Sequence, residues 1–139
     1  MSFLPEDDHE FLNENGIRHQ LLTEKLPDGT DRRGVLFPGF EFTGNLWTAQ
    51  NGNRVSCTAC DLLVLIPSGY ATTKLDSFYT LPRLKRPDGN DPQAATVEQV
   101  LFQKTWQFWS RHLDDADWRV GKGDLRIYLS YIRNELRSA

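Results

Sequence analysis

The sequence contains only two cysteines, Cys57 and Cys60, in a single CxxC pattern. A structural zinc site uses four ligands, but there is no second cysteine pair, and His9, His19 and His112 are scattered along the chain. A thioredoxin-like pair would stand beside a strand-to-helix turn, whereas this pair leads into an apolar strand. We therefore interpret the cysteines as small, half-buried residues at the entrance of a strand, with metal binding or redox chemistry as the alternatives.

Positive charge is also scarce, because 16 Lys and Arg stand against 19 Asp and Glu and leave a net charge of −3. General nucleic-acid binding requires a surplus of Lys and Arg on one face, and the nearest basic cluster, residues 83–87, is balanced by Asp88 and Asp91. The longest hydrophobic run, residues 62–67, is far too short to span a bilayer, and the acidic start of the chain does not resemble a signal peptide. The sequence thus predicts a cytoplasmic protein that binds neither nucleic acid nor membrane.

The composition present is that of one soluble globular domain. Of the 139 residues, 39% are hydrophobic and 25% are charged, which is enough to bury a core without disulfides or metals. We predict a single domain over residues 1–139. Its first helix lies within residues 5–16, because Pro5 and acidic residues mark the start and Gly16 marks the end.

Four strands are predicted after this helix. The first two flank the turn signal at residues 27–30, and the Pro-Gly pair at residues 38–39 is expected to bend or bulge the second. An Asn-Gly pair predicts a loop or hairpin tip within residues 44–57. The apolar run at residues 61–67 is typical of a central strand covered on both faces, and Pro82 stops the fourth strand.

Helices are predicted at the C-terminal end. Residues 96–109 carry apolar side chains in mixed phase, which we interpret as a helix or part of one. Apolar residues at three- and four-residue steps over residues 125–136 predict an amphipathic helix, with Asp124 as its N-cap. Arg133 and Arg137 lie near its C-terminal end, where the helix dipole favours cations. The predicted fold class is α+β, with an N-terminal helix, a four-stranded antiparallel meander and C-terminal helices.

This order of elements resembles the ubiquitin-conjugating (UBC) fold, and local motifs follow the same order. Residues 61–70, DLLVLIPSGY, resemble the third strand and the Pro-x-x-Tyr turn of that superfamily, and residues 75–84, LDSFYTLPRL, resemble its fourth strand. Residues 118–136 resemble the Trp-Ser-Pro segment and the helix after it. Together with WSRH at residues 109–112, these motifs make the chain similar to the prokaryotic ubiquitin-conjugating family E over nearly its whole length.

The resemblance implies a catalytic cysteine eight residues before the tryptophan of the Trp-Ser-Pro segment. Counted from Trp118, that position is Ser110, and no cysteine follows Cys60. The asparagine of the superfamily's His-Pro-Asn motif is not visible either. Transthiolation needs a thiolate, so the resemblance predicts a member that is non-catalytic or atypical.

A serine can act as nucleophile only where a base takes its proton. His112 is a candidate base, since an unperturbed imidazole has a pKa of about 6.5, and Asp114, Asp115 or Asp117 could orient it. If this stretch is helical, however, side chains two positions apart point away from each other. Catalysis by Ser110 and His112 therefore stands beside two other interpretations.

The first of these is a hydrogen-bonded structural corner, in which Arg111 pairs with an aspartate. The second is a binding surface formed by Trp109 and Arg111, because tryptophan and arginine are enriched at interface hot spots. Trp118 is expected to be a core residue.

The resemblance also implies partners: a ubiquitin-like protein, an adenylating activating enzyme and a JAB-type metallopeptidase, in systems linked to defence against phage. It places the activating-enzyme contact on the first helix, at Asp7, His9 and Phe11, with plain packing of that helix on the sheet as the alternative. No cofactor is implied.

Three functional hypotheses remain open from the sequence. The first is a non-catalytic or atypical conjugating-fold protein that holds the ubiquitin-like protein or the activating enzyme. The second is an active conjugating enzyme with a displaced nucleophile, which would be Cys57, Cys60, or Ser110 with His112. The third is a metal-binding or interaction domain unrelated to ubiquitin.

Overall fold

The protein has two helices and eight strands among the residues that its computed structural model describes, 3–70, 75–112 and 125–139. In chain order they are α1 (Glu6–Glu14), β1 (Gln20–Lys25), β2 (Asp31–Glu41), β3 (Trp47–Gln50), β4 (Asn53–Ser56), β5 (Ala59–Leu65), β6 (Asp76–Leu81), β7 (Val97–Leu101), β8 (Lys104–His112) and α2 (Leu125–Ser138). The predicted α+β class is confirmed.

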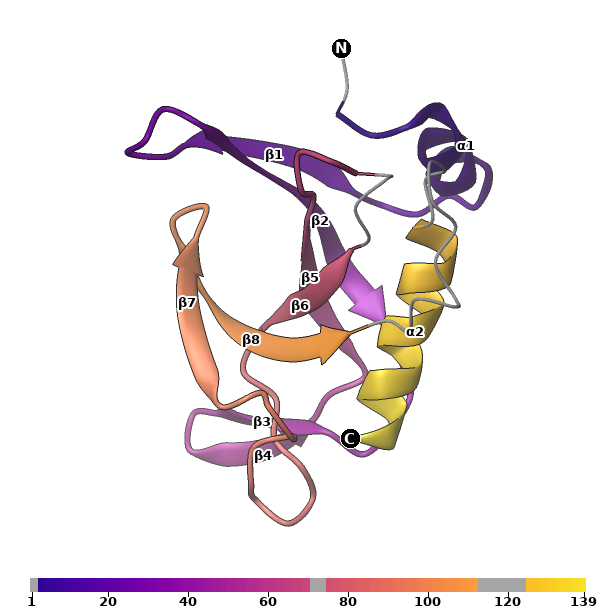
Figure 1. Cartoon of the computed structure of the whole chain (residues 1–139). Helices are drawn as coiled ribbons and strands as arrows, with labels where there is room; N and C mark the ends of the chain where they lie inside the picture. The colour runs from indigo at the N-terminus through magenta and orange to yellow at the C-terminus, as the bar shows by residue number, and fades with distance from the viewer. Residues whose placement is uncertain (1–2, 71–74, 113–124) are drawn as a thin grey trace.

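The main sheet is antiparallel and has six strands in the order β1-β2-β5-β6-β8-β7, while β3 and β4 form a separate hairpin. The four predicted strands correspond to β1, β2, β5 and β6, which are consecutive neighbours in the sheet. The prediction of only four strands was wrong, because β8 and β7 extend the sheet beyond β6. Figure 1 shows α2 lying across one face of this sheet, with α1 near the N-terminal end of α2.

The helix predicted within residues 96–109 is instead the β7–β8 hairpin. Its turn is formed by Phe102 and Gln103, both at positive φ (50° and 67°), as the tight turns of hairpins require. Along β8, Trp106 packs on one face of the sheet and Trp109 on the other. Tryptophans three positions apart suggest a helical stripe, but here they serve two different cores.

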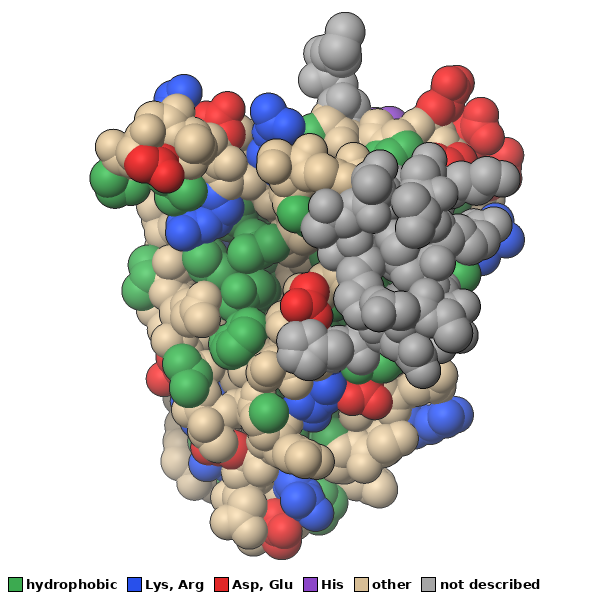
Figure 2. Space-filling model, in the orientation of Figure 1, with side chains coloured by type: hydrophobic (Ala, Val, Ile, Leu, Met, Phe, Trp, Pro, Cys, Tyr) green, Lys and Arg blue, Asp and Glu red, His purple; other side chains and the backbone are tan. Residues whose placement is uncertain are grey.

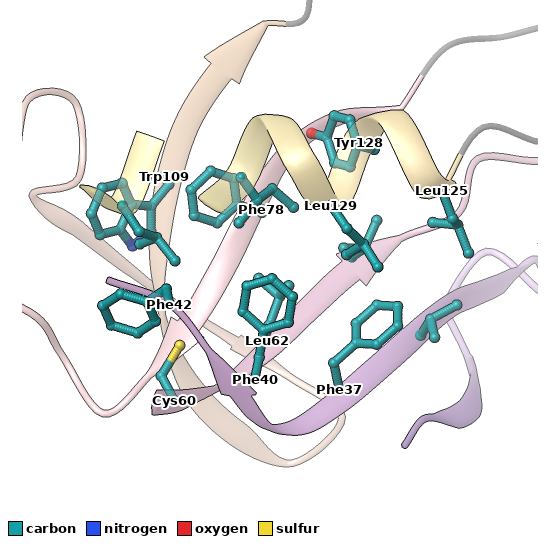
Figure 3. Packing of buried hydrophobic residues seen from close by; sticks show 14 of the residues in the cluster. Phe37, Phe40, Phe42, Cys60, Leu62, Phe78, Trp109, Leu125, Tyr128 and Leu129 are labelled. Carbon is teal, nitrogen blue, oxygen red and sulfur yellow. The ribbon is translucent and has the colours of Figure 1, made fainter. Parts of the chain in front are cut away.

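Those two cores cover both faces of the sheet. Between the sheet and α2 lies the larger core, which takes up the whole apolar stripe of α2 and, from β5, Leu62 and Val64 (Figure 3). On the opposite face Leu63 packs with Tyr79 and Trp106 in a smaller core. The prediction of a central strand covered on both faces is therefore confirmed for β5.

The sheet curls around the smaller core. The backbone N–H of Phe102, in the β7–β8 turn, donates to Glu24 Oε1 at 3.2 Å, so the turn lies against β1. Figure 2 shows hydrophobic side chains gathered on this concave side, between the β1–β2 and β7–β8 hairpins. Partly buried Leu22, Leu65 and Phe108 contribute to it.

Several local predictions are also confirmed. The register of β2 against β5 shifts between Phe37 and Phe40, where Gly39 has a φ of +62°, so the Pro-Gly pair does form a bulge. Asn51 and Gly52, both at positive φ, form the turn of the β3–β4 hairpin. Of the predicted C-terminal helices, α2 is the one that the described residues contain, and the predicted N-cap Asp124 lies outside them.

The described helices include none that combines the length and the apolar character needed to cross a membrane.

Candidate functional site

The WSRH motif forms the end of β8, beside the start of β6. Phe78 pairs with Trp109 and Asp76 pairs with His112, so the two β8 residues between them oppose the single β6 residue Ser77. This is a β-bulge, an irregularity that re-aims side chains and is common next to active sites. The objection that residues two apart on a helix diverge does not apply, because the motif is a bulged strand.

Trp109 is a core residue. It is fully buried, stacks on Phe78 with ring centroids 5.2 Å apart, and donates its indole N–H to Thr80 Oγ1 at 2.9 Å. The expectation that Trp109 offers a binding surface is therefore corrected: no part of its side chain is available to a partner in this structure.

Arg111 makes several contacts within the protein. Its Nε lies 2.5 Å from Glu135 Oε1 on α2, and its Nη1 donates to the carbonyl oxygen of Gln93 at 2.6 Å. The guanidinium carbon is 5.2 Å from the centroid of the Trp109 ring. These contacts tie β8 to α2 and to the segment before β7, as a structural corner does, although the partner acid is a glutamate rather than the expected aspartate.

Ser110 is half-buried, and its backbone N–H donates to the carbonyl oxygen of Ala94 at 2.9 Å. The candidate orienting acids Asp114, Asp115 and Asp117 lie outside the described residues. The sheet register instead brings the exposed residue Asp76 directly opposite His112. Sequence reasoning missed Asp76, because only the pairing of β6 with β8, two strands far apart in the chain, reveals it.

A groove of about 800 Å³, which we call the Asp76 groove, is lined in part by Asp76. The rest of its lining comes from the β1–β2 turn region, from Arg32 and Arg33, and from the end of β5 with Leu65 and the following Ile66. The groove is therefore apolar along part of its length and meets a carboxylate beside the WSRH end of β8.

The family model described as "Prokaryotic E2 family E" matches residues 4–139. The chain belongs to prokaryotic E2 family E. Neither a curated protein nor a solved structure matches it. The family supports a ubiquitin-conjugation-like role and interaction with ubiquitin-like protein machinery in general terms.

In this family E chain, both cysteines are buried at the entrance of β5 (Figure 3 shows Cys60). Burial raises the pKa of both thiols, and for Cys60 the neighbouring Cys57 and Asp61 raise it further. Cys57 Sγ donates to the carbonyl oxygen of Ala59 at 3.0 Å. Both sulfurs are therefore held as neutral thiols, whereas a nucleophilic cysteine needs a lowered pKa.

The two cysteines also lie at the other end of the sheet from Ser110. Cys60 precedes Asp61, which pairs with Leu81 at the end of β6, while Ser110 faces Ser77 near its start. At about 3.3 Å per residue, the four steps from Ser77 to Leu81 span roughly 13 Å. Among the described residues, no group of three or more His, Cys, Asp and Glu side chains could hold a metal ion.

On α1, the three predicted contact residues differ in exposure. Asp7 is exposed, while His9 and Phe11 are half-buried. Phe11 packs against the main core, and the Arg126 guanidinium lies 5.3 Å from its ring centroid. Part of the helix therefore packs on the body of the protein, and its free side carries acidic residues: Glu6, Asp7, Glu10 and Glu14.

Proposed function

We propose that this family E protein is an atypical UBC-fold protein that holds a ubiquitin-like protein without forming a cysteine thioester. The carrying observation is the state of its only two thiols: Cys57 and Cys60 are buried in the core and their pKa values are raised. A cysteine attacks an activated carbonyl as an accessible thiolate, and burial in the core opposes both the access and the ionisation.

In this proposal the Asp76 groove receives the extended tail of the ubiquitin-like protein. Its mixed apolar and charged lining suits a peptide segment, and Asp76 in that lining pairs with His112, two residues after Ser110. The free acidic side of α1, around Asp7, binds the adenylating activating enzyme, and a JAB-type peptidase acts in the same pathway.

One observation favours a second candidate, an oxyester version of the chemistry. Asp76 pairs with His112 across β6 and β8, and in this version of the proposal a carboxylate orients an imidazole that accepts the proton of Ser110. In that reaction the Ser110 oxygen would attack the thioester carbonyl of the ubiquitin-like protein on its activating enzyme and release the enzyme's thiol.

Incubation with activating enzyme, ATP and the ubiquitin-like protein, followed by gels with and without reductant, tests the proposal. We expect no reductant-sensitive adduct, and we expect a Cys57→Ala/Cys60→Ala variant that remains folded to bind the ubiquitin-like protein as the native chain does. A reducible adduct lost in either single cysteine variant would overturn the proposal. A reductant-stable, hydroxylamine-sensitive adduct lost in Ser110→Ala would establish the oxyester version.

The α1 contact has its own test. Asp7→Lys reverses one exposed charge, and we expect it to weaken binding to the activating enzyme while leaving binding to the ubiquitin-like protein unchanged. Asp88→Lys, a charge reversal of the same sign at an exposed position in the loop before β7, is the matched control. Equal weakening by both variants would show a general charge effect and contradict the contact.

A further inference from the structure

A second groove, of about 910 Å³, lies on the side of the larger core and shares none of the described lining residues of the Asp76 groove. One wall is the end of β2 and the start of β5, including Glu41 and Thr58, and the other is the C-terminal half of α2, including Arg133 and Arg137. We call it the arginine groove.

The two guanidinium groups of the arginine groove are held by their neighbours. Arg133 lies over the ring of Phe40, with its guanidinium carbon 4.6 Å from the ring centroid, and its Nε donates to the Glu41 carbonyl oxygen at 3.4 Å. Arg137 donates from Nη2 to Asn134 Oδ1 at 3.0 Å. An arginine side chain has five N–H donors, so most donors of both residues remain available to a ligand.

Neither arginine is neutralised within the part of the chain that the structure describes, where no carboxylate oxygen lies within 4.0 Å of either guanidinium. Helix C-termini favour cations, which accounts for Arg137 in the last turn. The dipole effect falls off within that turn, so it does not account for Arg133, whose guanidinium is placed by Phe40 on β2. In a protein of net charge −3, the two arginines outnumber Glu41, the one carboxylate among the described residues that line the groove, and give the groove a net positive charge.

The walls of the arginine groove are fixed to each other. Gly44, which follows β2, has a φ of +141°, and a Cβ atom there would lie 3.0 Å from the carbonyl oxygen of Leu136 and 3.1 Å from the Cα of Arg137. Backbone therefore touches backbone where the strand side meets α2, and the spacing between the walls is set by the fold.

The spacing of the two arginines indicates how the charges of a matching ligand are spaced. Residues four apart on a helix are separated by about 6 Å along its axis, and alternate residues of an extended chain are separated by about 6.6 Å. Alternate side chains of an extended segment point the same way, and guanidinium groups bind carboxylates in bidentate pairs. We propose that the arginine groove binds an extended protein segment that carries carboxylates on alternate residues, one for Arg133 and one for Arg137. This site does not depend on the function proposed above.

Fluorescence polarisation with a labelled Glu-Ser-Glu-Ser-Glu peptide tests the proposal. We expect saturable binding to the native chain, binding at least about tenfold weaker in Arg133→Gln/Arg137→Gln because two charge-assisted pairs are lost, and a change below about twofold in Arg126→Gln. Arg126 is an exposed arginine on the same helix outside the groove, so this control removes the same kind of charge. Thermal melts confirm that each variant is folded.

Three further arms make the test specific. A Gln-Ser-Gln-Ser-Gln peptide should not bind, and a Glu-Glu-Ser-Ser-Ser peptide should bind more weakly, because adjacent carboxylates of an extended chain point to opposite sides. Glu41→Gln should tighten binding, since it removes a negative charge from the groove. Equal affinity for the glutamine peptide, unchanged affinity in the double variant, or tighter binding of an oligothymidylate or of inorganic phosphate at the same arginines would overturn the proposal.

Discussion

Asp8 on α1 accepts a hydrogen bond at 3.0 Å from the backbone N–H of Leu125, the first residue of α2, across 117 positions of sequence. The first N–H groups of a helix have no partner within it, and a carboxylate there also interacts favourably with the helix dipole. The other oxygen of Asp8 accepts from the Tyr70 hydroxyl at 2.5 Å. The N-terminal helix thus supplies a cap for the C-terminal helix, and the two ends of the chain are joined at one buried carboxylate.

Replacement of this carboxylate should be costly. We expect Asp8→Ala to lower the free energy of unfolding by about 2–3 kcal/mol, because a buried N–H and a hydroxyl both lose their acceptor. Asp8→Asn keeps an acceptor but loses the charge and should cost less. Urea denaturation measures both, and Asp7→Ala, at the exposed neighbouring position, should stay within about 0.5 kcal/mol of the native chain. Similar losses at positions 7 and 8 would show that the cap contributes nothing of its own.

The thiols offer a simple chemical test of their environment. Because burial raises the pKa of Cys57 and Cys60, and thiolates rather than thiols react with disulfide reagents, we expect the native protein to react very slowly with Ellman's reagent at pH 8. In denaturing urea both cysteines should react at the rate of free cysteine. One equivalent of fast-reacting thiol in the native protein would contradict this and would reopen a catalytic role for that cysteine.

The sequence predicts an element well when its apolar residues follow a regular pattern, either on one buried face or on both faces. α2 was found because its buried residues follow the helical period, and β5 because its run is apolar throughout. The β7–β8 hairpin was missed because β8 is buried on both faces yet keeps polar residues such as Gln107, which is satisfied in the core by the backbone of Leu84 and Ala95. Such a strand has neither clean alternation nor a continuous apolar run.

Parts of the candidate site depend on contacts that local sequence does not contain. Ser110 is a candidate through the resemblance alone, since that argument counts residues along the chain. Asp76 could not, because its place opposite His112 depends on the β6–β8 register and on the bulge at Ser77. Trp109 was misjudged for the same reason: its burial is set by Phe78 and α2, which are distant in sequence.

The ion pair between Arg111 and Glu135 allows a structural role of Arg111 to be distinguished from a role in binding a partner. Its side chains are 13% and 31% exposed, and such partly buried pairs couple more strongly than surface pairs. In a double-mutant cycle of Arg111→Met and Glu135→Gln, we expect a coupling energy of about 1–3 kcal/mol in unfolding. Glu135→Gln should leave binding of the ubiquitin-like protein unchanged. A coupling near zero, combined with weaker binding in Arg111→Met alone, would show instead that Arg111 serves a partner.

Asp91 should give the protein an acid-sensitive contribution to its stability. The hydrogen bonds from Arg83, supported by the charges of Arg83 and Lys85, lower the pKa of Asp91 in the folded chain. A folded pKa below the unfolded value of about 3.9 means that the folded state holds its proton less tightly. The stabilisation is then fully present above the unfolded pKa and is lost as pH falls through the lower folded value.

Asp91→Asn should therefore lower the melting temperature near neutral pH, and the difference in melting temperature between this variant and the native chain should narrow as pH falls below about 4. Asp88→Asn, in the same loop with a carboxylate exposed to solvent, is the control and should lower the melting temperature less at neutral pH. If the melting temperature of Asp91→Asn stays below that of the native chain by a constant amount from neutral pH to about pH 2.5, the ionisation of Asp91 is not what stabilises the loop.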